Sequence, residues 1–473
     1  MSASAVHDHE PLDLMSHRLR SPDYKAWRAQ VHAVGGCAQP VHLTGYSRVL
    51  DRDGEILIER SGPIMGPCGN RREAVCPACS DRYAADAFHL LRAGLAGDAT
   101  KNVPATVTVH PRAFVTLTAP SFGAVHSRRL SPRGFVVPCP CGEHHHADDP
   151  RPGTALDPER YDYTAAVLWQ AHAGKLFDRF TTALRRALAQ HLGVPVREFR
   201  DHVRLSYAKV AEYQRRGLVH FHMVVRVDGP DGPADPCPFG LDNDALRAAL
   251  LHAVTTATLT VNRPDDTPLG LRFGTQVDVR PVTRSAARAV EDPDTGAITD
   301  TALAGYIAKY ATKGTGATDG ADRPIRDGEH IALLNVTPHH RAMIETAWEL
   351  GGLDRYDELN LRRWAHMLGF RGHFLTKSRR YSTTFTSMRA ERRTWRLRED
   401  LAQLGRDTRT PGDPGPLVPD LDTITVINHW EPVHFGHHNH AERELAIAIA
   451  ERNREQRQQQ RNIMSTTDTR SAA

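Results

Sequence analysis

The chain has 473 residues, of which 40% are hydrophobic and 25% are charged, so it can bury a core and form two or three domains. Its formal net charge of +4 is too small to indicate a partner by itself. The polar N-terminus and the lack of any run of about 18 apolar residues predict neither a signal peptide nor a membrane span. Seven cysteines in short spacings favour metal sites over disulfides, so we expect a cytoplasmic protein.

Residues 1–34 are polar, and we predict a disordered tail for them. The next segment, residues 35–100, contains a Cys-x-x-Cys pair and two further cysteines. Four thiolates suit a tetrahedral structural Zn²⁺ site. The predicted zinc ligands are Cys37, Cys68, Cys76 and Cys79. The alternative is four small buried residues, because the first two cysteines lie too far apart for a standard zinc finger.

The alternation of bulky apolar residues with threonines in Ala113–Ala119 predicts a β-strand that ends before Pro120. A loop insertion follows over residues 136–150, where two cysteines and three histidines lie close together in sequence. This cluster suits a possible second zinc site. The predicted ligands are Cys139, Cys141, His144 and His146. The alternatives are a ligand from Asp148 or Asp149, or a mobile His-rich loop without metal.

Two further strands are predicted after a long helix over Tyr163–His191. The first, Val203–Val210, leads into Glu212, and the second, Leu218–Val227, is apolar and β-branched.

The second of these strands contains a His-x-His motif. Side chains alternate along a strand, so His220 and His222 point to one face and lie about 7 Å apart, close enough to bind one metal ion. The third ligand is expected from Glu212 or Gln214. A strand with two half-exposed histidines and no metal is the alternative.

Residues 306–313 contain two overlapping Tyr-x-x-Lys motifs. Residues four apart share one face of a helix, so Tyr306 and Tyr310 would lie together, with Lys309 and Lys313 beside them. The chain has only 7 lysines among its 60 basic residues, and two of them lie here.

The C-terminal third is basic. Residues 320–400 predict a mainly helical region, in which Leu361–Arg398 contains eleven basic residues and one acid. Such a block favours a phosphate-binding surface over a merely solvated basic face. The expected DNA contacts are Arg371, Lys377, Arg379 and Arg380. Residues 405–473 predict a linker and a C-terminal helix.

The order of the Phe-Val-Thr-Leu-Thr strand, the His-x-His strand and the Tyr-x-x-Lys helix resembles that of the HUH endonucleases, which start rolling-circle replication. Further stretches, including Trp364–Thr384, are similar to the replication initiators of actinobacterial rolling-circle plasmids and integrating conjugative elements. The likeness covers most of residues 35–390. It implies an α+β fold with an HUH core over residues 105–316, in which a central antiparallel sheet of about five strands carries the histidines on a middle strand.

The resemblance also implies an activity. A tyrosine, Tyr306 or Tyr310, would nick one strand at a double-strand origin and become joined to the 5′ phosphate, which frees a 3′-OH primer. Mg²⁺ or Mn²⁺ on the His-x-His motif would neutralise the scissile phosphate. Lys309 or Lys313 would lower the tyrosine pKa or hold the phosphate.

The expected partners are double- and single-stranded origin DNA and a host DNA polymerase. The chain lacks a Gly-x-x-x-x-Gly-Lys-Ser/Thr loop, so we expect no nucleotide cofactor and a separate host helicase. The alternative functions are an HUH relaxase or transposase nuclease, or a zinc-stabilised DNA-binding regulator without catalysis. Relaxases usually place the tyrosine before the histidines, and here it follows them.

Overall fold

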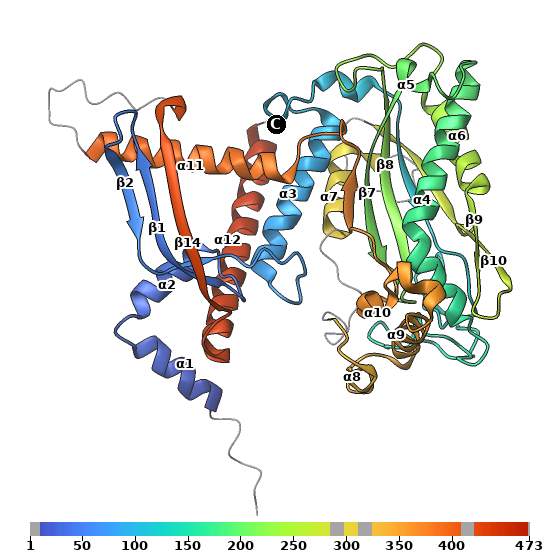
Figure 1. The fold of residues 1–473 in the computed structure, drawn as a ribbon, viewed down its shortest axis with the longest axis horizontal. Coiled ribbons are helices and arrows are strands. Elements are labelled where there is room, and N and C mark those ends of the chain that lie inside the picture. Colours follow the sequence, from blue (N-terminus) through green and yellow to red (C-terminus); the bar gives the residue numbers. More distant parts are fainter. Residues whose placement is uncertain (1–9, 284–297, 311–323, 408–420, 472–473) are drawn as a thin grey trace, which may run out of the picture. The chain divides into compact units, whose positions relative to one another are not determined.

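A computed structural model describes the protein over residues 10–283, 298–310, 324–407 and 421–471. Its contacts divide the chain into two compact units (Figure 1). The central unit is Ala87–Thr383, and the terminal unit combines Met1–Asp86 with Thr384–Ala473. Both ends of the sequence therefore contribute to one unit.

The central unit is built on a six-stranded sheet. In their order across the sheet, its strands are β12 (Ile298–Thr299), β11 (Val277–Thr283), β4 (Arg112–Leu117), β8 (Val219–Asp228), β7 (Arg204–Tyr213) and β13 (Leu375–Lys377). Every neighbouring pair is antiparallel except β11 with β12, which is parallel. The predicted α+β class with an antiparallel sheet is confirmed, and the histidine-bearing β8 is an interior strand between β4 and β7.

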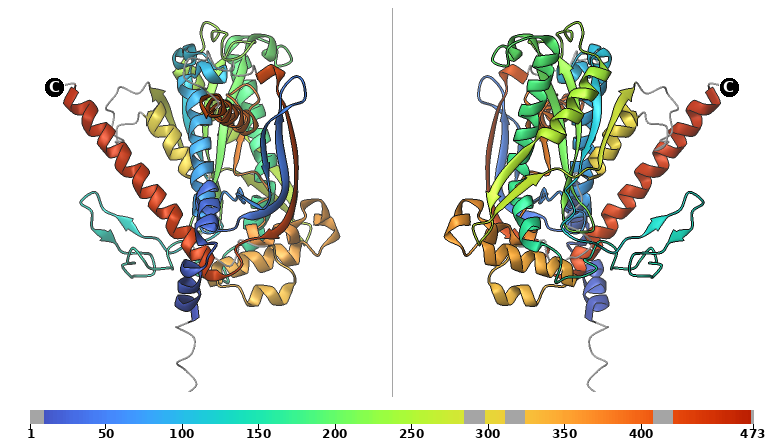
Figure 2. Two further views of the ribbon diagram at one scale, coloured as in Figure 1. Left: turned by 90° about the vertical axis from the view of Figure 1, so that its left-hand side faces the viewer. Right: turned by 90° about the vertical axis from the view of Figure 1, so that its right-hand side faces the viewer.

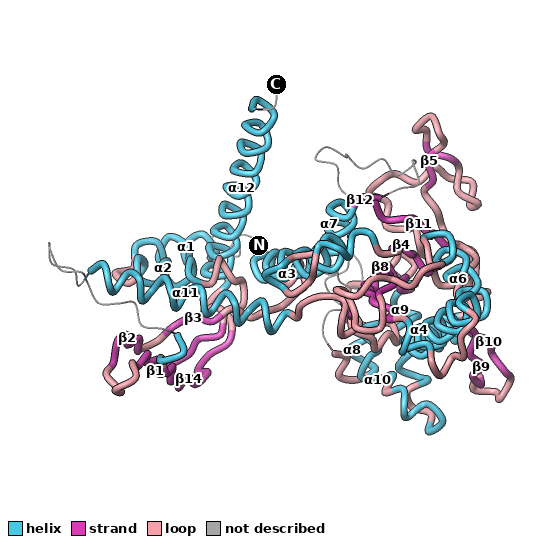
Figure 3. The backbone as a smooth tube through the Cα atoms, turned by 90° about the horizontal axis from the view of Figure 1, so that it is seen from above, coloured by secondary structure: helices cyan, strands magenta, loops and turns pink. Residues whose placement is uncertain are grey.

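Helices cover both faces of this sheet. They include α3 (Pro77–Ala96), which begins in the terminal unit, α4 (Tyr163–Leu192), α5 (Phe199–His202), α6 (Asn243–Thr256), α7 (Asp300–Tyr310), α8 (Gly328–Ala332), α9 (Pro338–Leu350) and α10 (Leu361–Trp364). On one face α4 packs with α6, and its Phe177 lies 5.8 Å from the ring of Phe221 in β8. The other face is covered by α7 and the C-terminal half of α3, where Arg226 of β8 donates to the carbonyl of Gly94 (Figures 1 and 3).

Short elements complete the central unit. They are the hairpins β5 (Arg129–Leu130) with β6 (Val136–Val137) and β9 (Thr258–Asn262) with β10 (Pro268–Arg272), and the 3-10 helices η1 (Ala99–Lys101), η2 (Ala105–Val109), η4 (Asp354–Leu359) and η5 (Ala365–Met367). The β5–β6 hairpin extends away from the six-stranded sheet (Figures 2 and 3).

A buried charge network braces the sheet beneath α3. Asp228 at the end of β8 has no exposed side-chain surface and accepts hydrogen bonds from two groups of Arg226, at 2.6 and 2.9 Å. It also contacts Nδ1 of His110 at 2.8 Å and accepts a hydrogen bond from the Ser206 hydroxyl at 2.6 Å. Burial alone would raise the pKa of Asp228, but the hydrogen bonds with His110 and Arg226 outweigh burial and lower it. The carboxylate therefore stays ionised inside the fold.

The terminal unit has its own antiparallel sheet. Its strands are β1 (Val41–Leu50), β2 (Ile56–Ser61), β3 (Ile64–Gly66) and β14 (Thr425–Phe435), and its helices are α1 (Glu10–Arg20), α2 (Tyr24–Ala33), the start of α3, α11 (Phe385–Asp407), the 3-10 helix η6 (Leu421–Thr423) and α12 (His440–Ser471). The longest pairing joins β1 to β14 across almost the whole chain.

Two sequence-based expectations for this unit need correction. Residues 10–33 form two helices, and Trp27 and Val31 are buried, so the predicted disorder of residues 1–34 is wrong there; residues 1–9 lie outside the described part. The region 405–473 contains β14 as well as the predicted helix, and β14 pairs with β1 from the other end of the chain.

Candidate metal and nucleophile site

The central unit brings a carboxylate and two imidazoles together. The register of β7 with β8 places Glu212 opposite His220 and Val210 opposite His222. One carboxylate oxygen, Oε2 of Glu212, lies 2.9 Å from Nε2 of each histidine. The potential ligand atoms of these three residues all lie within 4.8 Å of one another. Two strands held by backbone hydrogen bonds therefore present three metal-ligating groups at one point.

Residues of β4 orient the inner histidine. Thr116 pairs with His222 across the strands, and its hydroxyl lies 3.2 Å from Nδ1 of that ring. Phe114 stacks on the same imidazole with ring centroids 5.8 Å apart and planes 13° apart. Since Nδ1 is engaged by Thr116, Nε2 is turned toward Glu212. The sequence predicts this strand but indicates no role for Thr116 or Phe114. The alternation of threonines with apolar residues shows only that the threonines share one face of the strand.

Helix α7 brings a tyrosine to this site. The Tyr306 ring lies 5.2 Å from the His222 ring and 5.8 Å from the Phe114 ring, in edge-to-face contact with both. Lys309 is exposed on the same helix. Tyr310 is the last residue of α7, but its side chain and the whole of Lys313 lie outside the described part of the structure.

Gln214 occupies a different position from Glu212. It follows the end of β7, and its carboxamide oxygen accepts a hydrogen bond from Nε of Arg216 at 2.9 Å. The Arg216 guanidinium also donates to the carbonyls of Ala119 and Pro120. Gln214 is thus engaged in the turn between β7 and β8, whereas Glu212 faces both histidines.

The three facing groups fit a divalent cation. A carboxylate oxygen and two imidazole nitrogens are ligands that Mn²⁺ accepts, and Mg²⁺ accepts the oxygen more readily than the nitrogens. In an octahedron with arms of about 2.1 Å, adjacent ligand atoms are roughly 3 Å apart. The separations of 2.9 Å between Glu212 and each histidine match such adjacent positions. A three-residue set leaves the remaining coordination positions for substrate and water.

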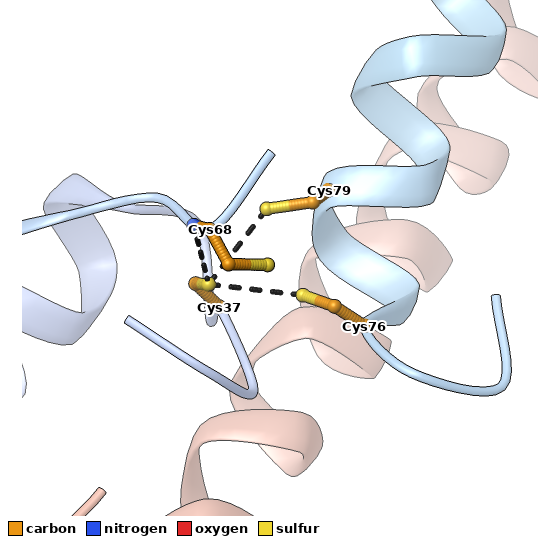
Figure 4. Close-up of side chains that lie close together, drawn as sticks. All are labelled: Cys37, Cys68, Cys76 and Cys79. Atoms are coloured by element: carbon orange, nitrogen blue, oxygen red, sulfur yellow. Dashed lines mark hydrogen bonds between the residues drawn. The ribbon is translucent and has the colours of Figure 1, made fainter. Parts of the chain in front are cut away.

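The four N-terminal cysteines form a second cluster, in the terminal unit (Figure 4). The Sγ atom of Cys37 lies 3.7 Å from the Sγ atoms of Cys76 and Cys79. A zinc–sulfur distance of about 2.3 Å gives a tetrahedral edge of roughly 3.8 Å, so these separations fit a Zn²⁺ site. The backbone N–H groups of Ala38 and Cys68 donate to sulfur atoms of the cluster, as suits thiolates. The cluster can therefore bind a metal such as zinc.

The predicted ligands of the second cysteine cluster need correction. Cys139 and Cys141 meet His126 and His145, and the potential ligand atoms of these four residues lie within 4.8 Å of one another. The predicted ligands His144 and His146 are both exposed, and His146 contacts Asp148 instead. The buried middle histidine of the three points inward because the chain turns tightly between Cys139 and Glu143. The fourth member, His126, lies before the hairpin, outside the closely spaced Cys/His motif, so the local sequence pattern does not indicate it.

The predicted DNA contacts differ in their surroundings. The ammonium group of half-buried Lys377 donates to backbone carbonyls, including that of Ser382 at 2.9 Å, and exposed Arg371 donates to the Glu358 carbonyl. Arg379 and Arg380 are also exposed and line a cleft of about 440 Å³ in the central unit, where Arg380 donates to the Pro230 carbonyl. Three more arginines line the same cleft: Arg185, Arg200 and Arg204. Five guanidinium groups around one cleft suit phosphate binding.

Comparison with known proteins identifies the family. The family described as "Replication initiator protein, pSAM2" (RepSA) matches residues 23–451. A replication initiator protein of Streptomyces ambofaciens is 44% identical over 429 residues, which are 88% of each chain. No solved structure gives a significant match. These matches define the class, a DNA replication initiator. In particular, the chain belongs to the RepSA family of replication initiator proteins.

Within the described ranges, no helix is both long and apolar enough to cross a membrane.

Proposed function

We propose that this replication initiator is a rolling-circle endonuclease of the HUH type, which nicks one strand at its origin by tyrosine attack and later rejoins it. The observation that carries the proposal is the meeting of Glu212, His220 and His222 beside the Tyr306 ring. A DNA-binding regulator would have no need for a nucleophile next to three metal-ligating groups. The order of the motifs, with the tyrosine helix last, favours an initiator over a relaxase.

In this proposal Tyr306 is the first nucleophile. A free tyrosine hydroxyl has a pKa near 10, so a tyrosine needs help to attack an anionic phosphodiester. Glu212, His220 and His222 would hold a divalent cation, Mg²⁺ or Mn²⁺, which would supply charge neutralisation at the non-bridging phosphate oxygens. Thr116 keeps the His222 ring oriented for this task. Lys309, exposed on α7, would attract the phosphate by its charge.

The strand transfer exchanges one phosphodiester bond for another, so it needs no external energy source. The Tyr306 oxygen forms a bond to phosphorus while the bond from phosphorus to the 3′ oxygen breaks. The tyrosine loses its proton, and the leaving 3′ oxygen takes one up to give a 3′-OH primer. Reversal by a 3′-OH rejoins the strand. Tyr310, four residues away, would serve as the second nucleophile when replication ends.

The remaining parts of the chain have supporting roles in the proposal. The arginine-lined cleft at Arg379 and Arg380 would bind the DNA backbone, and the four-cysteine cluster would hold a structural Zn²⁺ ion. As a functional division, residues 105–316 would carry the nuclease and residues 320–400 the basic DNA contacts. A host helicase would unwind the duplex, and a host polymerase would extend the primer.

A nicking assay tests the proposal. Wild-type protein and the variants Tyr306→Phe and Tyr310→Phe are incubated with a supercoiled plasmid that carries the element's own origin, in Mn²⁺, Mg²⁺ or chelator. We expect a metal-dependent nick and a protein–5′-phosphate adduct that Tyr306→Phe reduces on the order of 10³-fold. Tyr310→Phe is the matched control and should keep the first nick. Loss in Tyr310→Phe alone would overturn the assignment of Tyr306, and nicking that survives chelation would overturn the metal-dependent mechanism.

A further inference from the structure

The β5–β6 hairpin of the central unit is braced at its base by a cluster of cysteines and histidines. The ends of the segment are tied by backbone hydrogen bonds of His126 with Gly153 and Thr154, at 2.8 and 2.9 Å. Cys139 and Cys141 follow β6, and His145 follows them after a tight turn. The cluster thus joins the entry to the hairpin with its exit, and the hairpin itself projects away from the sheet (Figure 2).

The separations within this cluster are those of a tetrahedral metal site. Nδ1 of His126 lies 3.3 Å from Nε2 of His145 and 3.9 Å from Sγ of Cys139. Sγ of Cys141 lies 3.5 Å from Nε2 of His145. With zinc–nitrogen and zinc–sulfur distances of about 2.0 and 2.3 Å, tetrahedral edges range from roughly 3.3 Å between nitrogens to 3.8 Å between sulfurs. The nitrogen–nitrogen separation matches its edge, and the two nitrogen–sulfur separations of 3.5 and 3.9 Å lie within about 0.4 Å of the mixed edge of roughly 3.5 Å.

Groups around the cluster prepare it for a cation. Nδ1 of His145, which faces away from the cluster, contacts the Asp149 carboxylate at 2.8 Å, and that carboxylate is paired with Arg151. A carboxylate on the far nitrogen is the usual outer partner of a zinc-bound histidine. The backbone N–H of Ser127 donates to Sγ of Cys139 at 3.4 Å, as suits a thiolate ligand.

We propose that His126, Cys139, Cys141 and His145 bind one structural Zn²⁺ ion, which fixes the β5–β6 hairpin as an arm that contacts DNA. All four ligands come from the chain itself, so the site is closed and its role is structural. The segment is too short to hold its shape by a hydrophobic core, and the metal supplies the missing free energy.

The tip of the hairpin has the chemistry of a nucleic-acid contact. Residues 127–137 contain three arginines and no acidic residue. Phe135 is 71% exposed there and Leu130 is 55% exposed. Exposed arginines bind phosphates, and an exposed aromatic ring stacks on an unpaired base, as an opened origin would offer. The DNA part of the inference rests on the proposed function, whereas the metal part does not.

The metal part is tested by zinc content of the full-length protein. We expect His126→Gln and His145→Gln to lose one equivalent of zinc per chain, whereas the matched variants His144→Gln and His146→Gln keep it. Cys76→Ser removes a ligand of the four-cysteine cluster, so its zinc content measures that cluster separately from the hairpin cluster. In Co²⁺-substituted protein, the band lost in His145→Gln should be that of a Cys₂His₂ site and not of a Cys₄ site. Equal zinc content in wild type, His126→Gln and His145→Gln would overturn the site.

The DNA part is tested by fluorescence anisotropy with a single-stranded origin oligonucleotide. We expect Phe135→Ala to weaken binding about 10-fold. Phe239→Ala is the control, because Phe239 is fully exposed on another loop of the same unit. His145→Gln should weaken binding as much as Phe135→Ala does, and the two effects should not add. Equal affinity of wild type and Phe135→Ala, with the zinc equivalent still bound, would overturn the arm while leaving the metal site intact.

Discussion

Two clusters of the central unit hold metal-ligating side chains in different ways. Glu212, His220 and His222 lie on paired strands, and their contacting ligand atoms are 2.9 Å apart. The Cys/His cluster at the base of the β5–β6 hairpin lies on loops, with separations of 3.3 to 3.9 Å. The sheet fixes the first group through backbone hydrogen bonds, and three ligands would leave coordination positions open on a bound metal. The loop cluster offers four potential ligands and, in our proposal, would depend on its metal for shape.

The largest expected effect comes from removing the carboxylate of the strand-held site. Glu212→Gln keeps the shape of the side chain and removes its charge, so we expect the nicking rate to fall on the order of 10³-fold, with weaker Mn²⁺ binding. The measurement is a single-turnover nicking rate together with Mn²⁺ affinity by calorimetry. Gln214→Ala is the control, and it should change the rate by less than about 3-fold, because Gln214 is engaged by Arg216. The reverse ranking of these two variants would make Gln214 the third ligand.

The two clusters also differ in how far the sequence predicts them. Strand alternation has a period of two, so the common face of His220 and His222 followed directly from their spacing. The register that brings Glu212 opposite His220 depends on a tight turn, which also lies close in sequence. In the hairpin cluster no such period exists. The choice of His145 over His144 and His146 depends on how a loop turns, and His126 comes from outside the local motif.

The elements of the fold differ in the same way, since local periodic segments are predictable and long-range pairings are not. The interior strands β4, β7 and β8 and the helix α4 lie close to their predicted positions, because long periodic segments carry a strong signal. The pairing of β1 with β14 joins segments nearly 400 residues apart, and nothing local indicates it. Likewise, α2 was hidden by its many polar residues, although it buries Trp27 and Val31.

Glu212, His220 and His222 keep their places only while the sheet is folded, and the sheet contains the fully buried ion pair of Asp228 with Arg226. Asp228→Asn leaves the fully buried Arg226 without its counter-charge, so we expect a loss of about 3 kcal/mol in the free energy of unfolding at pH 7. Urea denaturation monitored by circular dichroism measures it. Since the pKa of Asp228 is lowered in the folded state, this contribution is present above its ordinary pKa and is lost as the pH falls. The variant and wild type should therefore converge in acid, and a constant difference at all pH values would contradict the ion-pair account.

The same sheet also buries a lysine, which makes the opposite prediction. Lys209 of β7 lies over the rings of Phe177 and Phe221, at 4.0 and 4.2 Å, and burial lowers its pKa to about 8. The folded state disfavours the charged form, so the cost is full below pH 8 and disappears as the pH rises toward 10.5. We expect Lys209→Met to raise the free energy of unfolding by about 2 kcal/mol at pH 7, with the gain shrinking above pH 8. Urea titrations at pH 7 and pH 10 measure it, and a destabilised variant at pH 7 would show that the ring contacts outweigh desolvation.

The smallest expected effect tests whether the sheet orients the metal ligands or only carries them. Thr116→Val removes the hydroxyl that lies 3.2 Å from Nδ1 of His222 and keeps the β-branched shape. Loss of such an outer partner typically lowers metal affinity by about 10-fold, so the Mn²⁺ concentration for half-maximal nicking should rise by that factor, while the rate at saturating Mn²⁺ stays nearly constant. Thr118→Val is the control, since Thr118 lies just beyond β4. If Thr116→Val instead lowers the saturated rate without changing the Mn²⁺ dependence, the hydroxyl acts on substrate and not on the histidine. A metal effect confined to Thr116 would show that strand pairing positions the hydroxyl beside His222 as firmly as it positions the metal-ligating groups, whereas in our proposal the loop cluster would need its own ion for such order.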